Sequence, residues 1–153
     1  MTATLPDLIG QLARNWPHQE LDRVQYEREL ADCPLDALAA AVRVLLRVPR
    51  EWRPGIGDVR AAVAEKLLAL PSERDAARQV DARIAWARDR QGDPPPVHAL
   101  VREAVAHVGG WHSIRAADRP EVVRGQLLRF YRDARQAEIR ETAAQDMDAI
   151  TPA

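Results

Sequence analysis

Apolar residues recur along this chain at the spacing of an α-helix, and this periodicity constrains the fold more than any other feature. Leu5, Leu8, Ile9, Leu12 and Trp16 follow one another at intervals that place them on one face of a helix. The same spacing returns along most of the sequence, and no segment alternates as a strand does. The sequence therefore predicts an all-α protein, a compact multi-helix bundle of about six to seven helices.

Residues that begin or end helices mark the limits of these segments. Thr4 and Ser72 each precede an aspartate by three positions, as N-cap residues do. Pro34 opens the third helix, and Gly109 is expected to end the sixth helix in a left-handed conformation. A long final helix is predicted to begin near Pro120.

The clearest break in the sequence is the stretch QGDPPP, because three consecutive prolines favour a stiff, extended chain. It suggests a helical domain over residues 1–91, a Pro-rich linker over 92–96 and a C-terminal helical segment over 97–143. Periodicity fades after that segment, so residues 144–153 are predicted to form a flexible tail. Two small helical subdomains joined by the linker are thus the alternative to one bundle.

Composition restricts the partners and the compartment. The formal net charge is −1, so no overall field attracts nucleic acid or a membrane surface. Cys33 is the only cysteine, which favours a reducing compartment. The first residues lack the features of a secretory signal, and no apolar run approaches the roughly 20 residues of a membrane span. We therefore expect a cytoplasmic protein that does not contact the membrane.

No group of residues has the spacing of a catalytic, cofactor-binding or metal site. No i, i+4 pair occurs among the four histidines, His18, His98, His107 and His112. The glycine-containing stretches lack the spacing and the Lys-Ser/Thr ending of a phosphate-binding loop. We expect no enzymatic activity, no cofactor and no metal, and we expect Cys33 to be a small buried residue.

A stripe of arginines is the first candidate for a binding surface. Arg43, Arg47 and Arg50 recur at helical spacing on the polar side of the third helix, and Arg53 follows in the loop PREWRPGIG with Trp52 among them. Arginines beside an exposed indole suit a phosphate backbone or an acidic patch on a partner. The sequence favours the simpler interpretation, in which Trp52 anchors the loop in the core and the arginines are solvated.

Arginines also outnumber acidic residues on the final helix. They are Arg119, Arg124, Arg129, Arg132, Arg135 and Arg140, against Glu121, Asp133 and Glu138. Because their positions spread around the helix, we interpret them as mostly solvated, with a weak contact to nucleic acid as the alternative.

A more specific pattern runs from residue 26 to residue 59. Its members, in order, are Tyr26, Leu30, Pro34, Leu38, Val42 and then Trp52-Arg53-Pro54-x-Ile56-x-x-Val59. This pattern resembles the N-terminal domain of bacteriophage replicative-helicase loader/inhibitor proteins, which share an aromatic residue, an Ala-rich helix and an aromatic-x-Pro-x-Ile-x-x-Ile/Val signature. The resemblance covers about residues 5–70 and continues more weakly beyond them.

The resemblance implies a non-enzymatic DNA replication accessory protein in a bacterial host cell. Its partner would be a hexameric replicative helicase, which it loads or inhibits, with a replication initiator as a further candidate partner. In that family a flexible C-terminal region grips the helicase, whereas residues 97–143 of this chain are predicted to be helical, so no helicase-contact residue is carried over.

The candidate partner-binding residues are therefore Arg43, Arg47, Arg50 and Arg53. The alternative function is a DNA-binding accessory or regulatory protein, although no helix-turn-helix with a basic recognition helix is evident.

Overall fold

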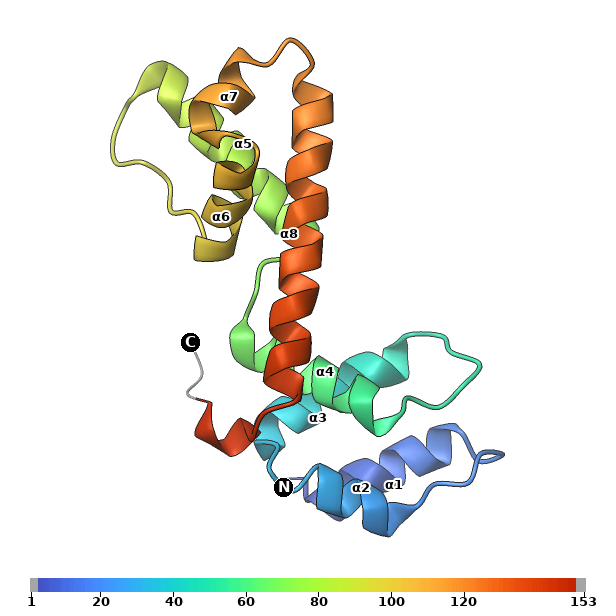
Figure 1. Cartoon of the computed structure of the whole chain (residues 1–153). Coiled ribbons are helices and arrows are strands. Elements are labelled where there is room, and N and C mark those ends of the chain that lie inside the picture. The colour runs from blue at the N-terminus through green and yellow to red at the C-terminus, as the bar shows by residue number, and fades with distance from the viewer. Residues whose placement is uncertain (1–2, 151–153) are drawn as a thin grey trace. The chain divides into compact units, whose positions relative to one another are not determined.

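The computed structural model describes residues 3–150, and every regular element in that range is helical (Figure 1). These residues form eight α-helices and one short 3₁₀ helix, which confirms the predicted all-α class. The helices are α1 (Leu5–Asn15), α2 (Arg23–Glu29), α3 (Leu35–Arg47), α4 (Ile56–Leu68), α5 (Glu73–Asp89), α6 (Ala99–His107), α7 (Gly110–Ala116), α8 (Pro120–Ala143) and η1 (Met147–Ala149). Within residues 3–150, no helix is long and apolar enough to cross a membrane.

The predicted helix starts at Thr4 and Ser72 are confirmed. The Thr4 hydroxyl accepts a hydrogen bond from the backbone N–H of Asp7, and the Asp7 carboxylate accepts one from the N–H of Thr4 at 3.1 Å. Ser72 caps α5 in the same way, accepting from the N–H of Asp75 at 3.1 Å. Each cap satisfies backbone donors that the first turn of a helix leaves unpaired.

The turn between α6 and α7 depends on Gly109. Its φ of 94° lies in the left-handed region, as the sequence predicted, and a Cβ there would stand 2.6 Å from the Ser113 hydroxyl oxygen. The conformation and the lack of space both require glycine at this position.

The chain divides into two units, and the division differs from the expected one. Unit 1 comprises residues 1–69 and 139–153, and unit 2 comprises residues 70–138. Helix α4 ends at Leu68, Ala69 takes a left-handed φ of 46°, and Pro71 follows within two residues. Because proline cannot continue a helix, the break falls there.

The expected linker, residues 92–96, lies inside unit 2 and connects α5 to α6. The Trp86 indole N–H donates to the carbonyl of Gly92 at 3.1 Å, and the N–H of His98 donates to the Gln79 side chain at 2.8 Å. Both ends of the Pro-rich loop are therefore tied to α5. Consecutive prolines favour a stiff, extended segment, but this local property does not reveal that the chain returns to the same core.

Helix α3 is the centre of unit 1, because it packs against both α1 and α4. Its residues Leu38 and Val42 are fully buried, as are Leu12 of α1 and Val59 and Val63 of α4. These are the positions that the helical periodicity marked as apolar. The core of unit 1 thus follows directly from the spacing of the sequence.

The expectation of a flexible tail does not hold for residues 144–150, and residues 151–153 lie outside the described part of the chain. Met147 is completely buried, and its sulfur lies 3.8 Å from the sulfur of Cys33. Its backbone N–H donates to the Asp32 carboxylate at 3.1 Å. The segment is ordered because the apolar side chain of Met147 reaches the core. A single apolar residue produces no periodic pattern, so the sequence did not indicate this contact.

Arg60 on α4 joins three separate parts of unit 1. Its guanidinium makes a two-fold contact with the Asp32 carboxylate, at 2.6 and 2.8 Å. It also donates to the carbonyls of Glu29, Ala143 and Gln145, at 2.6, 2.8 and 2.7 Å. The planar fork of an arginine can satisfy this many acceptors at once, which a lysine cannot.

Unit 2 has its own core, in which α5, α6, α7 and the first part of α8 meet (Figure 1). Val80, Val101, Val105 and Leu127 are buried there, and Tyr131 is completely buried. The Tyr131 hydroxyl donates to the carbonyl of Pro71 at 2.6 Å. The break before α5 is therefore fixed to the core by α8.

We predict that Arg60→Ala lowers the free energy of unfolding by about 2–4 kcal/mol, because it leaves a carboxylate and three carbonyls without their donor. Urea denaturation followed by circular dichroism measures the effect. The matched control is Arg28→Ala, which removes an exposed ion pair with Glu29 and is expected to unfold like the parent. Parental stability in Arg60→Ala would show that the five hydrogen bonds contribute little.

The same contact predicts that unit 1 loses stability in acid. Hydrogen bonds from Arg60 hold the pKa of Asp32 below its ordinary value of 3.8. A carboxyl with a depressed pKa in the folded protein stabilises it above the unfolded pKa, and this stabilisation disappears as the pH falls through the folded pKa. Urea midpoints measured from about pH 5 down to about pH 2 should therefore fall less steeply in Asp32→Asn than in the parent.

Candidate functional site

The loop after α3, residues 48–55, is held by two aromatic side chains from the segment that precedes α3. The Trp16 indole N–H donates to the carbonyl of Arg50 at 3.3 Å, and the Tyr26 hydroxyl donates to the carbonyl of Pro54 at 2.8 Å. Both aromatic rings are buried. Each of these two anchors holds the loop by a backbone carbonyl and makes no use of the Trp52 side chain.

Arg53 and Gln19 hold the middle of the same loop. The Gln19 side chain donates to the carbonyl of Glu51 at 3.1 Å and accepts from the N–H of Arg53 at 2.7 Å. The Arg53 guanidinium donates to the carbonyls of Gln19 and Glu20 and lies 5.6 Å from the ring centre of Tyr26. Arg53 is thus occupied inside unit 1, although the sequence grouped it with the candidate partner-binding arginines.

Trp52 does not anchor the loop, contrary to the favoured interpretation of the sequence. Its side chain is 70 % exposed, whereas Trp16 is 8 % exposed. The sequence predicted that an aromatic residue, Trp52, holds this loop. Aromatic residues do hold it, but they are Trp16 and Tyr26, which lie far from the loop in sequence. Trp52 is left to face solvent because the backbone on both sides of it is already held.

Of the other candidate arginines, Arg43 and Arg47 lie in the second half of α3. Arg50, which the sequence placed on the same helix, lies in the loop that follows it. Arg43 and Arg47 are exposed, and neither forms an ion pair with any described residue. Arg50 makes only a long contact of 3.9 Å with Asp58. Arg47 lies in the last turn of α3, where a cation also counters the helix dipole. That effect is local and does not account for Arg43.

Two exposed valines alternate with these arginines. Val44 is 42 % exposed and Val48 is 45 % exposed. We use the name Trp52 surface for the following set of residues on α3 and its loop: Arg43, Val44, Arg47, Val48, Arg50 and Trp52. Its valines and Trp52 supply exposed apolar area, and its arginines Arg43 and Arg47 supply positive charge that no described carboxylate pairs with.

Three side chains of types that often carry catalysis, Cys33, His98 and His107, are buried or take part in structural contacts. Burial raises the pKa of the Cys33 thiol to about 11, which disfavours the nucleophilic thiolate. The His98 ring accepts from the N–H of Leu100 at 3.2 Å, and the His107 ring stacks on Phe130 with 4.0 Å between centres. Among residues 3–150, no three His, Cys, Asp or Glu side chains are placed to hold a metal ion.

Three arginines of the final helix bind groups within unit 2. Arg124 forms a two-fold ion pair with Asp81 on α5, at 2.6 and 2.8 Å, and Arg132 forms one with Glu73, at 2.5 and 2.8 Å. Arg135 donates to the carbonyl of Pro71 at 3.1 Å. These arginines connect α8 to α5, a role that the sequence did not indicate because the partners are more than forty residues away.

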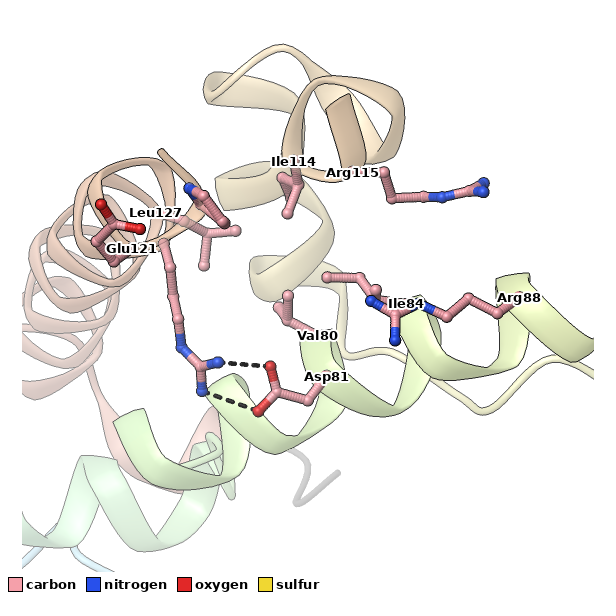
Figure 2. A pocket seen from close by; sticks show the side chains of 10 residues that line it. Val80, Asp81, Ile84, Arg88, Ile114, Arg115, Glu121 and Leu127 are labelled. Carbon is pink, nitrogen blue, oxygen red and sulfur yellow. Dashed lines mark hydrogen bonds and ion pairs between the residues drawn. The ribbon is translucent and has the colours of Figure 1, made fainter. Parts of the chain in front are cut away.

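An open groove of about 620 Å³ lies in unit 2. Its apolar floor is formed by Val80 and Ile84 of α5, Ile114 of α7 and Leu127 of α8. Figure 2 shows the dashed ion pair to Asp81 beside this floor, with Arg88 and Arg115 extending on another side of the groove. The sequence did not indicate this groove, although it named Arg124 of the lining among the arginines of the final helix, because the lining is drawn from three separate helices.

Comparisons of the sequence with family models and with curated proteins, and of the structure with solved structures, found no match. The resemblance of residues 5–70 to helicase loaders and inhibitors therefore depends on the motif that carries it. Candidate functional surfaces are therefore identified from the exposure and charge of side chains within each unit.

We predict that Trp16→Ala lowers the free energy of unfolding by about 3–5 kcal/mol, as loss of a buried aromatic side chain does. Trp52→Ala is expected to melt like the parent, since its indole is exposed. Thermal melts of the two variants, followed by circular dichroism, compare one substitution at two sites. Strong destabilisation by Trp52→Ala would mean that this indole is buried in solution.

Proposed function

We propose that this protein is a non-enzymatic adapter that binds a hexameric replicative helicase through the Trp52 surface and thereby loads or inhibits it. The proposal depends above all on the 70 % exposure of Trp52 on a loop whose backbone is fixed on both sides of it. A large aromatic side chain exposed on a fixed loop stabilises no core and is suited to contact a partner.

The fixed loop favours tight binding. Association is opposed by the entropy lost when mobile loops and side chains become ordered. The hydrogen bonds from Trp16, Gln19 and Tyr26 have already ordered the backbone around Trp52. If a partner accepts the indole in a pocket, most of the free energy of burying the indole would therefore contribute to binding, as it does for tryptophans at binding hot spots.

The composition of the Trp52 surface favours a protein over nucleic acid as its partner. Val44 and Val48 offer apolar area that a phosphate backbone cannot use, whereas the core of a protein interface is rich in aromatic, apolar and arginine side chains. Arg43 and Arg47 would then pair with an acidic patch at the rim. DNA remains the alternative partner, and it would use the arginines without the valines.

The identity of the partner comes from the resemblance of residues 5–70 to helicase loaders and inhibitors. That range nearly coincides with residues 1–69, the first segment of unit 1, so the resembling part is a folded element that carries the Trp52 surface. The chain departs from the family in its C-terminal part, where α8 replaces the flexible region that grips the helicase in the family. The helicase contact is therefore assigned to a surface of unit 1.

We predict that Trp52→Ala weakens binding to the replicative helicase encoded in the same gene neighbourhood by about thirtyfold or more, as truncation of a hot-spot residue does. The double variant Arg43→Glu and Arg47→Glu should also weaken binding, and the affinity of the parent should fall with salt because the screening length is about 8 Å at physiological ionic strength. Biolayer interferometry with the immobilised helicase measures both effects.

The controls change another exposed apolar side chain and another pair of arginines elsewhere on unit 1. They are Val24→Ala, which removes an apolar side chain that is 76 % exposed, and the pair Arg23→Glu and Arg28→Glu on α2. Both should bind like the parent. Unchanged helicase binding by Trp52→Ala would contradict the proposal, and loss of DNA affinity with intact helicase binding in the arginine variant would favour the DNA-binding alternative. Helicase ATPase and strand-unwinding assays then separate loading from inhibition.

A further inference from the structure

Unit 2 carries a second concentration of arginine, at the end of α5 and on α7. The groove described above shares Ile84 and Arg115 with a neighbouring hollow of about 250 Å³. That hollow is also lined by Arg83, Trp86, Arg90 and Trp111. We use the name Arg–Trp groove for the following residues of the two connected hollows: Arg83, Trp86, Arg88, Arg90, Trp111 and Arg115.

Arginines outnumber carboxylates in the lining of the two hollows. None of the four arginines of the Arg–Trp groove forms an ion pair with a described residue, whereas Arg124 and Arg132 of the same unit are both paired. The smaller hollow has no carboxylate in its lining, whereas the larger one is also lined by Glu121 and by Asp81, which Arg124 binds. Arg88 and Arg115 lie in the last turns of α5 and α7, where each also counters a helix dipole. That effect does not account for Arg83, which lies before the last turn of α5. The groove thus presents a local positive field.

The two tryptophans of the groove are held in place. The Trp86 indole donates to Gly92, and the Arg83 guanidinium lies over its ring at 4.6 Å from the centre. Trp111 packs against the core of unit 2. Both side chains remain partly exposed. Part of each indole is therefore open to a flat ligand, at little cost in conformational entropy.

We infer that the Arg–Trp groove binds single-stranded nucleic acid, with its arginines on the phosphates and its indoles against bases. Proteins that hold single strands combine a positive groove with aromatic side chains on which bases stack. In a duplex the base faces are stacked inside and out of reach, so duplex DNA would use the arginines alone. An acidic peptide would likewise leave the indoles without a flat partner. The inference goes beyond the proposed helicase binding and involves a different unit.

The test is a titration of the full chain against fluorescein-labelled oligothymidylate of about 15 nucleotides, a length within the usual range for one binding domain. The double variant Arg88→Glu and Arg115→Glu should bind at least about tenfold more weakly. If each arginine contacts one phosphate, the dependence of log affinity on log salt should also become shallower by about 1.4, because each contact to a single strand contributes about 0.7.

The control is the double variant Arg74→Glu and Arg129→Glu, which makes the same change of charge on unit 2 outside the groove. It should bind nearly like the parent.

Quenching of tryptophan fluorescence by the oligonucleotide should be lost in Trp86→Phe with Trp111→Phe, and it should persist in Trp52→Phe. Circular dichroism melts confirm that each variant is folded. Oligouridylate of the same length distinguishes RNA from DNA, and binding of either supports the inference.

Four outcomes would overturn the inference. Three are parental affinity in the Arg88 and Arg115 variant, equal losses in the Arg74 and Arg129 control, and equal affinity for single-stranded and duplex DNA. The fourth is displacement of the oligonucleotide by a polyglutamate peptide at equal charge, which would identify a site for acidic proteins instead. The titration contains no helicase, so its result does not depend on the proposed role of the Trp52 surface.

Discussion

The guanidinium of Arg60 is the contact on which the organisation of unit 1 depends. It lies on α4, yet its acceptors belong to the end of α2, to Asp32 before α3, to the last residue of α8 and to the chain that follows α8. Those segments enter unit 1 from places far apart in the sequence, and they also bury apolar side chains such as Leu30 and Met147. A partly buried, charge-assisted network therefore joins these segments in addition to their apolar contacts.

The position of Trp52 follows from the same arrangement. Arg60 fixes the end of α2 relative to α4, since it binds the carbonyl of Glu29. Tyr26 on α2 can then reach the carbonyl of Pro54, just before α4 begins. With the second half of the loop held in this way and Trp16 holding Arg50, the intervening side chain has no place in the core. Exposure of Trp52 is a consequence of how the loop is anchored.

The sequence predicted features that depend on residues a few positions apart. The caps at Thr4 and Ser72, the left-handed Gly109 and the helical class all follow from local rules. It did not predict which aromatic residue anchors the loop, because the contact from Trp16 joins residues 34 apart. The sequence also did not predict the order of the tail or the return of the Pro-rich loop to α5. Each depends on a contact with a residue farther away in the chain, Asp32 for the tail and Gln79 for the loop.

Net charge proved a poor guide to the local electrostatics of this chain. With 22 basic and 23 acidic residues, the formal charge is −1, which suggested that no field attracts polyanions. The structure distributes these charges unevenly. Arg60, Arg124 and Arg132 are bound to carboxylates, and Arg53 to backbone carbonyls. The arginines of the Arg–Trp groove, and Arg43 and Arg47 on the Trp52 surface, have no such partner among the described residues. Because fields at a protein surface are screened beyond about 8 Å at physiological salt, a partner responds to the arginines within that distance and not to the sum over the chain.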